Sequence, residues 1–324
     1  MKKVLKNLEP SIRSYLGDAF CFSIIDDVAF ESGWVYDKYI HMEYTPEDGQ
    51  IKYADYDYYD FVPGEGVFIK SFTQIPIGCC EKEKICRQIE EMIDGGEYFF
   101  ALWDENVITN YLYGESRTDV YEHGCFLYGY DSDARMFDTQ GYLGEEKWKR
   151  VQVPYDVFYQ ALSYFPEKGE IAYIGYELVK DKVWQFDFDR MKRGITDYCC
   201  SLQGDTGRIL DLRAEKTFFE QMRRSRRVHY PSLYCIYEHK KVMRRRAEFL
   251  NGQFPAERGE ELCESARQLE KEFKKVMLLG VQFLMNHPPY LLEEIVEKAV
   301  KAVEDEQIFL EQLTQRLFHG EGSS

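Results

Sequence analysis

The stretch at residues 120–142 constrains the fold of this chain more than any other. It reads VYEHGCFLYGYDSDARMFDTQGY, in which aromatic and apolar residues flank the turn-forming cluster at residues 131–134. Two such runs around Asp and Ser residues are typical of a β-hairpin. We therefore predict two antiparallel strands, at residues 123–130 and 135–140, with the turn between them.

The register of this hairpin decides which of its side chains share a face. A turn at residues 131–134 pairs Leu127 with Asp138 and Cys125 with Gln140. Side chains alternate between the two faces of a strand, so each face collects every second residue. The residues predicted on one face are His123, Cys125, Asp138, Gln140 and Tyr142.

His123 on this hairpin is a candidate general base. Several cysteine-nucleophile enzymes use such a histidine as their base and hold it with a carboxylate or amide on the neighbouring strand. Asp138 is the predicted partner, but four positions along a strand span roughly 13 Å. Asp138 reaches His123 only if a bulge or an asymmetric turn shifts the register. Gln140 is the alternative orienting residue.

Cys21 is the candidate nucleophile, within the apolar run at residues 20–25. A cysteine at the start of a helix has a lowered thiol pKa, and only the thiolate attacks. The pattern at residues 22–29 fits either helix or strand. The alternative is that Cys21 is a small buried apolar residue, as most free cysteines are.

The chain length and the order of its patterns predict an α+β protein. At 324 residues it is long enough for one large or two moderate domains. We predict a β-rich body at residues 1–205 and a helical bundle at residues 206–324. The patterns in the body predict helices at residues 81–93 and 155–164, and strands at residues 67–77, 98–103, 107–113, 147–153 and 170–178.

The helical part ends in two long segments with apolar residues at helical spacing, at residues 257–286 and 291–318. Pro288 and Pro289 separate them, and proline interrupts a helix. We therefore predict an antiparallel helical hairpin. Its apolar stripe is buried either within the chain or in a homodimer.

Charge and cysteine spacing exclude several classes of function. The net charge of −16 argues against nucleic-acid binding, which needs a positive surface. The sequence has no signal peptide and no apolar run of about 18 residues, so we expect a cytoplasmic protein that does not bind membranes. The nine cysteines are expected to be free thiols, and their spacing is not that of a metal site. No nucleotide-binding motif occurs, so we expect no cofactor.

A basic region stands out in this acidic chain. One interpretation is a solvated helix face, on which His239 is a surface residue. The other is a docking patch for an acidic partner protein, with Arg244 and Arg245 at its centre. The members of the region are Arg223, Arg224, Arg226, Arg227, Lys240, Lys241, Arg244, Arg245 and Arg246.

Two segments carry a resemblance to a known family. The segment HGCFLYGYDSDARMFDTQGY, with His123 and Asp138, resembles the histidine signature of bacteriocin-processing cysteine peptidases and, more closely, of butirosin-type acyltransferases. The segment YEHKKVMRRRAEFL at residues 237–250 is similar to the helical E-H-K-x-x-M-x-x-R segment that follows the papain-like domain in the latter. The resemblance implies a papain-like cysteine-protease fold with Cys21, His123 and Asp138 as catalytic triad.

The resemblance also implies an activity. In such an acyltransferase Cys21 takes an acyl group from a carrier-protein thioester, and an amine then releases it as an amide in natural-product biosynthesis. Phosphopantetheine enters only as part of the carrier substrate, and the partners are an acyl or peptidyl carrier protein and a small amine. The aromatic residues Trp103, Tyr111, Tyr113 and Tyr142 either line a dry acyl pocket or pack as ordinary core.

One element of the implied site has no obvious source in the sequence. Papain-like enzymes take an oxyanion-hole donor from a Gln a few residues before the cysteine, and residues 1–20 contain none. Asn7, Tyr15 or the backbone N–H of Cys21 would have to serve instead. Two alternatives to the acyltransferase are therefore retained: a cysteine peptidase or thioester hydrolase, and a catalytically silent papain-fold binding module.

Overall fold

The computed structural model describes residues 1–54, 64, 66–74, 81–144, 148–162, 173–179, 183–200, 209–252 and 256–319. The chain divides into two compact units. The first unit consists of Met1–Val28 and Asp60–Val183, and the second of Ala29–Tyr59 and Trp184–Ser324. The predicted boundary at residue 205 thus falls inside the second unit, which also takes a segment from the N-terminal part of the chain. Sequence texture marks local elements, but only packing decides which of them share a core.

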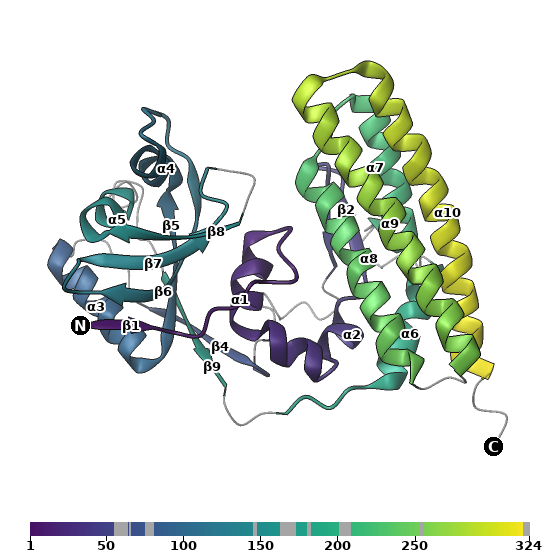
Figure 1. Cartoon of the computed structure of the whole chain (residues 1–324), viewed down its shortest axis with the longest axis horizontal. Helices are drawn as coiled ribbons and strands as arrows, with labels where there is room; N and C mark the ends of the chain where they lie inside the picture. The colour runs from purple at the N-terminus through teal and green to yellow at the C-terminus, as the bar shows by residue number, and fades with distance from the viewer. Residues whose placement is uncertain are drawn as a thin grey trace. The chain divides into compact units, whose positions relative to one another are not determined.

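An antiparallel sheet forms the centre of the first unit, with strand order β4-β9-β5-β6-β7-β8, and β1 pairs with β6. Figure 1 shows β6, β7 and β8 side by side, and β6 and β7 are the predicted hairpin. The strands are β1 (Lys2–Val4), β4 (Ile69–Gln74), β5 (Glu97–Asp104), β6 (Glu122–Asp131), β7 (Met136–Gly141), β8 (Lys149–Pro154) and β9 (Tyr173–Leu178).

Helices α3 (Lys82–Gly95), α4 (Glu105–Tyr113) and α5 (Tyr155–Leu162) share one apolar core with the sheet. The helix predicted at residues 81–93 is confirmed as α3. Its apolar residues recur at helical spacing, and Gly96 ends it in the left-handed region at φ 91°. Helix α1 (Leu16–Glu31) begins in the first unit and crosses its boundary with the second at residue 28.

The strand predicted at residues 107–113 is wrong, because these residues form most of α4. Asp104 caps the helix by accepting a hydrogen bond from the backbone N–H of Asn106, and Gly114 ends it at φ 66°. In a segment this short, apolar residues fit helical and strand periods almost equally well. The cap residues were the better signal.

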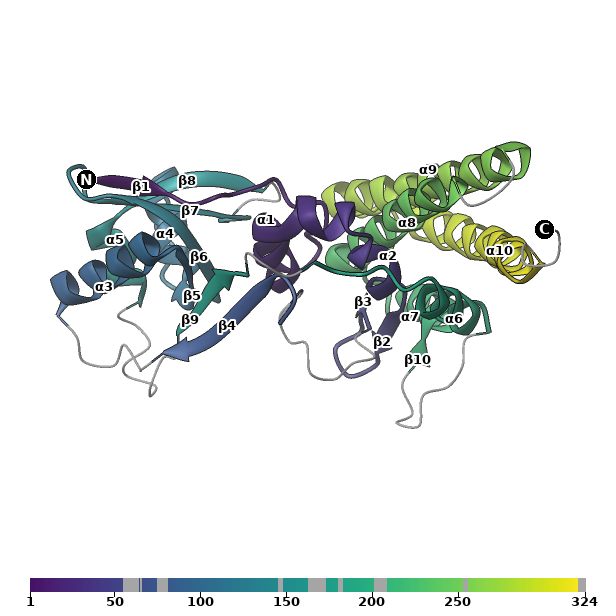
Figure 2. The same cartoon turned by 90° about the horizontal axis from the view of Figure 1, so that it is seen from below.

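The second unit combines long helices with a small sheet of order β10-β2-β3. Helix α9 packs against α8 and α10, which confirms the predicted helical hairpin around Pro288 and Pro289 (Figure 1). The small sheet packs against α7 and α8 (Figure 2). The elements are α2 (Trp34–Lys38), β2 (Met42–Thr45), β3 (Gln50–Tyr53), α6 (Phe188–Cys200), β10 (Ile209–Leu210), α7 (Asp211–Ser225), α8 (Tyr230–Asn251), α9 (Ala256–Asn286) and α10 (Pro289–His319).

Helix and antiparallel sheet are both present, which confirms the predicted α+β class. In the described part of the chain, no helix combines the length and apolar character that crossing a membrane requires.

Candidate functional site

Cys21 lies in the second turn of α1, which begins at Leu16, rather than at the start of the helix. Its side chain is buried, at 1% exposure. The neighbouring Phe20 ring stacks on Phe126 of β6 with ring centroids 5.1 Å apart, and meets Phe100 of β5 edge to face at 5.7 Å. These rings fill the space between α1 and one face of the sheet.

His123 belongs to the opposite face of the same sheet. It lies directly across from Trp103 of β5, and Trp103 is fully buried in the core that the sheet shares with α3, α4 and α5. Directly paired residues on neighbouring strands point to the same side. By contrast, a side chain at the next position, Gly124, would meet the Phe20 ring at 3.3 Å. Cys21 is therefore carried by a helix on one face of the sheet, whereas the His123 side chain points to the other face.

The carboxylate beside His123 is that of Glu105. The Nδ1 atom of His123 hydrogen-bonds Glu105 Oε2, and Glu105 Oε1 accepts a hydrogen bond from the backbone N–H of Gly144 at 2.8 Å. Glu105 is buried, whereas 27% of the His123 side chain is exposed. Two hydrogen bonds thus fix the orienting carboxylate, and Nε2 is the ring nitrogen left for proton transfer.

Sequence reasoning missed Glu105, although a signal was present. Glu105 is the second residue after Trp103, which pairs with His123, and it begins α4. The capping residue Asp104 starts a helix at this point and turns the chain, which brings Glu105 over His123. Interpreting residues 107–113 as a strand hid this turn.

The predicted register between the two hairpin strands is wrong. Asp138 pairs with Gly129 rather than Leu127, and a bulge follows between Gly129 and Leu127. The turn is shifted by one position, to residues 132–135, and includes Arg135 at φ 57°. At Gly129 a Cβ atom would lie 2.6 Å from Asp138 Oδ2 and 3.0 Å from the carbonyl oxygen of Lys3, so glycine is required there.

Asp138 and Gln140 face away from His123. Phe137, which precedes Asp138 on β7, lies in the same core as Trp103. Because side chains alternate along a strand, residues 138 and 140 point to the other face of the sheet. Asp138 accepts a hydrogen bond from Gln152 at 3.0 Å, and Gln140 accepts one from Asn7 at 3.0 Å. The structure therefore does not bring Cys21, His123 and Asp138 together, and neither candidate orienting residue reaches His123.

The aromatic candidates lie in separate environments. Trp103 is core, whereas Tyr111 is 46% exposed on α4. Tyr142 donates a hydrogen bond to the carbonyl oxygen of Arg13 at 2.7 Å and packs edge to face against Trp148. Core and local packing, rather than a shared acyl pocket, account for Trp103 and Tyr142.

The basic region of the second unit is largely engaged within the protein. Arg244 lies 2.5 Å from both Glu248 and Glu270, and the Arg245 guanidinium lies 3.4 Å from the centre of the Phe30 ring. These contacts hold the two arginines that were the centre of the predicted docking patch. The surface-face interpretation is wrong for three other residues: His239, Lys240 and Arg246 are at most 1% exposed.

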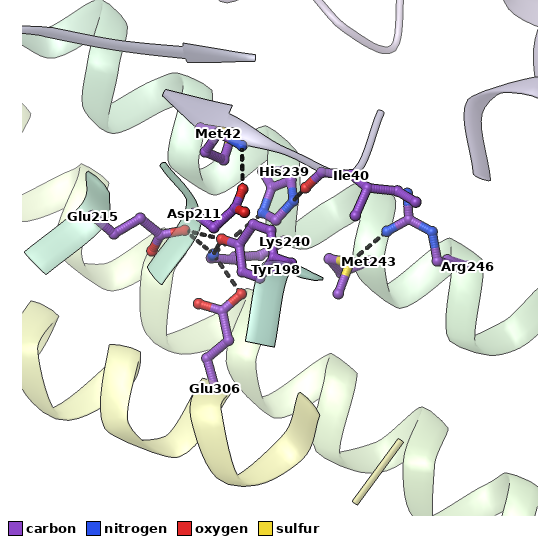
Figure 3. A network of polar contacts seen from close by, with 10 residues as sticks. All are labelled: Ile40, Met42, Tyr198, Asp211, Glu215, His239, Lys240, Met243, Arg246 and Glu306. Carbon is purple, nitrogen blue, oxygen red and sulfur yellow. Dashed lines mark hydrogen bonds and ion pairs between the residues drawn. The ribbon is translucent and has the colours of Figure 1, made fainter. Parts of the chain in front are cut away.

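Lys240 is the centre of a buried polar network (Figure 3). Its Nζ donates hydrogen bonds to Glu215 Oε1 at 2.5 Å and to Glu306 Oε1 at 2.6 Å, and lies 3.2 Å from His239 Nδ1. The Tyr198 hydroxyl donates to the same Glu215 oxygen at 2.5 Å. One ammonium thereby connects α7, α8 and α10, and Tyr198 adds α6.

His239 and Arg246 stabilise the chain that precedes β2. His239 Nε2 bonds the carbonyl oxygen of Ile40 at 2.7 Å, and Arg246 donates to the carbonyl oxygens of Tyr36 at 2.8 Å and Tyr39 at 2.7 Å. Lys240 has only protons to offer, so His239 Nδ1 accepts from it and Nε2 is the protonated nitrogen. The E-H-K-x-x-M-x-x-R segment of α8 is thus a set of buried structural contacts.

Burial shifts the pKa values of Glu306, Arg246 and His239 toward their uncharged forms. Burial, with the nearby charge of Glu215, raises the pKa of Glu306 to about 8. Burial lowers the pKa of Arg246 to about 10 and holds the pKa of His239 well below its ordinary value. A neutral His239 agrees with the hydrogen-bond pattern around it.

Glu215, His239 and Glu306 form a set with metal-ligand spacing, because one ligand atom from each lies within 4.8 Å of the others. Lys240 Nζ already contacts all three of these side chains. A metal ion would have to compete with the buried Lys240 ammonium for the same atoms. The arrangement is therefore that of an internal ion cluster rather than an open metal centre.

Comparison with known proteins gives no match, either to a protein-family model or to a curated protein.

Proposed function

We propose that this protein is a papain-related module that has no thiol catalysis of its own and binds partners in an amide-forming biosynthetic assembly. Three features support the papain-like relationship: an N-terminal helix with Cys21, an antiparallel sheet with His123 on a hairpin, and the resemblance of two segments to butirosin-type acyltransferases. The free thiols of the described cysteines support a cytoplasmic location.

One observation supports the proposed absence of thiol catalysis in this protein. The stacked rings of Phe20 and Phe126 lie between α1 and the sheet, while His123 bonds Glu105 on the sheet's far face. A nucleophilic cysteine needs a base within hydrogen-bonding reach and a route for substrate. His123 does not provide that base, because it lies on the other face of the sheet, and burial of Cys21 at 1% exposure shields its thiol from substrate.

The partners follow from the same resemblance. A carrier protein that bears an acyl-phosphopantetheine thioester is the partner we expect, together with the enzyme that supplies or accepts its amine. The net charge of −16 favours a positively charged surface on the second of these partners, the amine enzyme, because opposite potentials steer encounter. Binding should therefore weaken as salt is added.

Mass spectrometry of the protein with a butyryl-loaded carrier protein tests this function. We expect a non-covalent complex under native conditions and no butyryl adduct under denaturing conditions. A butyryl adduct that disappears in Cys21→Ser would overturn the proposal, and so would the absence of any complex. Alkylation by iodoacetamide adds an internal control: buried Cys21 should react at least about tenfold more slowly than exposed Cys200, because it must await local opening.

A second candidate function is supported by the partly exposed His123 and its buried partner Glu105. In this alternative, His123 Nε2 removes a proton from an amine that attacks the carrier thioester directly. The C–N bond forms as the C–S bond breaks, and the departing thiolate takes up the proton. This amide formation needs no acyl-cysteine.

The same incubation, with putrescine added as the amine, distinguishes the two functions. Butyryl-putrescine formed without an adduct, retained in Cys21→Ser and lost in His123→Gln, would support the second candidate and overturn the first. No amide product, together with a stable complex, supports the binding module.

A further inference from the structure

The cluster around Lys240 joins two carboxylates to a single ammonium. Glu215 of α7 and Glu306 of α10 each use Oε1 to accept a hydrogen bond from Lys240 of α8. All three side chains are at most 1% exposed. Two ionised carboxylates would leave one negative charge in excess in a buried site, which is costly.

The second oxygen of each carboxylate shows the same imbalance. Glu215 Oε2 and Glu306 Oε2 are buried and have no hydrogen-bond partner among the residues that the structure describes. Neither oxygen receives a hydrogen bond from a described residue, so either can itself carry a proton as the O–H of a carboxylic acid. One added proton also removes the excess charge.

Glu306 is the carboxyl group that should take this proton. Glu215 accepts from the Tyr198 hydroxyl as well as from Lys240, and hydrogen bonds to a carboxylate favour its ionised form. Lys240 is the partner shown for Glu306. Burial and the charge of Glu215 raise the pKa of Glu306 to about 8, which agrees with this assignment.

The other charged and titratable groups of the cluster make further contacts of their own. The Lys240 ammonium also lies 4.7 Å from the centre of the Phe273 ring of α9. Asp211 of α7 bonds His41 Nδ1 and the backbone N–H of Met42, each at 3.1 Å. The groups that face the cluster are Tyr198 from α6, Asp211 and Glu215 from α7, His239 and Lys240 from α8, and His41 from the segment before β2.

We propose that Glu306 is a proton-binding site that acts as a latch. Helix α10 is held firmly against α7 and α8 while the proton is bound, and loosely once the proton is lost. The proton lets Glu306 accept from Lys240 without adding a second buried negative charge. Loss of the proton leaves that charge uncompensated inside the helical unit, and moving α10 toward water relieves it.

The direction of the pH effect follows from linkage. The unfolded chain releases the Glu306 proton near the ordinary pKa of 4.5, whereas the folded chain holds it to about 8. Between these values the folded state binds more protons, so its stability falls as pH rises. Below about 4.5 the full contribution is present, and above about 8 it is lost.

Hydrogen exchange of the α10 amides, corrected for intrinsic rate and measured from about pH 6 to about pH 9, tests the latch. In the wild type we expect protection to fall with rising pH, by up to about tenfold per unit below the Glu306 pKa. Glu306→Gln mimics the protonated carboxyl and should remove this dependence. Equal profiles in the two proteins would overturn the proposal.

Glu215→Gln is the matched control, because it changes the other carboxyl of the same cluster. Glu306 then becomes the single counter-ion of Lys240, so its proton is released at lower pH. The alkaline loss of protection should vanish, and a new loss should appear on the acid side. Persistence of the alkaline loss in Glu215→Gln would contradict the proposal, because Glu306 carries no excess negative charge beside Lys240 in that variant.

Infrared spectroscopy of the wild type tests the proposal without requiring any variant to fold. With ¹³C-labelled glutamate, we expect a protonated-carboxyl band at pH about 6.5 that fades by pH about 9. If no such band is present at pH about 6.5, the cluster holds no carboxyl proton and the latch is excluded.

Discussion

The two units bury their polar side chains in different ways. In the first unit the buried polar groups form separate pairs, such as Glu105 with His123 and Gln140 with Asn7. In the second unit Lys240 connects groups on three helices and, through the shared oxygen of Glu215, a fourth. The pairs of the first unit lie on opposite faces of one sheet, whereas the network of the second unit is continuous.

This difference determines how each unit should respond to substitution. A separate pair can be lost with a local cost, because its neighbours keep their own partners. In a connected network the loss of the central cation leaves several groups unpaired at once. Stability of the second unit should therefore depend on single residues far more than stability of the first.

Lys240→Met is the strongest test of this comparison. Methionine approximates the length of the side chain but leaves Glu215 and Glu306 buried without a cation. We expect a loss of about 3–5 kcal/mol in the free energy of unfolding, measured by urea denaturation. Adding Glu215→Gln to this variant should recover part of the loss, because the buried charge is then removed.

Lys241→Met is the matched control on the same helix. Lys241 lies 5.8 Å from the centre of the Tyr237 ring, outside the buried cluster. We expect a change within about 1 kcal/mol. A similar loss in both variants would show that the network has no special weight.

Arg246→Lys tests the part of the network that stabilises the chain before β2. An ammonium keeps the charge but cannot donate to both Tyr36 and Tyr39 in the fork geometry of a guanidinium. We expect a loss of about 1–3 kcal/mol in the free energy of unfolding, with faster hydrogen exchange at residues 36–41. Arg245→Lys, beside it and stacked on Phe30, should cost less and leave that exchange unchanged.

The smallest expected effect is in the first unit, where Glu105→Gln and Asp138→Asn can be compared. The Glu105 change should move the His123 ring resonances in NMR spectra and cost about 1–2 kcal/mol in stability, since it removes a charged acceptor. The Asp138 change should leave those resonances in place. Movement of the His123 resonances in Asp138→Asn alone would restore the predicted pairing of these two residues.

Much of the fold can be predicted from the sequence because many of its elements produce local sequence patterns. The hairpin at residues 120–142, helix α3 and the helical pair around Pro288 each show a period, a turn signal or a break that local physics enforces. Helix α4 was missed because its apolar spacing is ambiguous in a short segment. Its start was still marked by the capping residue Asp104.

The candidate site was predictable only in part. His123 and a carboxylate do pair, but the carboxylate is Glu105, since the turn shifted by one residue and the bulge between Leu127 and Gly129 place Asp138 on the other face of the sheet. The charges of α8 resemble a solvated face in sequence. Their burial depends on Glu215 and Glu306, which lie 25 and 66 residues away from Lys240.

The sequence by itself determined the α+β class, the hairpin and the apolar faces of the long helices, because these arise from interactions over a few residues. Only the tertiary structure decided which face of the sheet each reactive side chain occupies and which charges are buried. A one-residue change in strand register reverses a face, and a buried charge is stable only beside partners that distant segments supply. Both are properties of the packed chain.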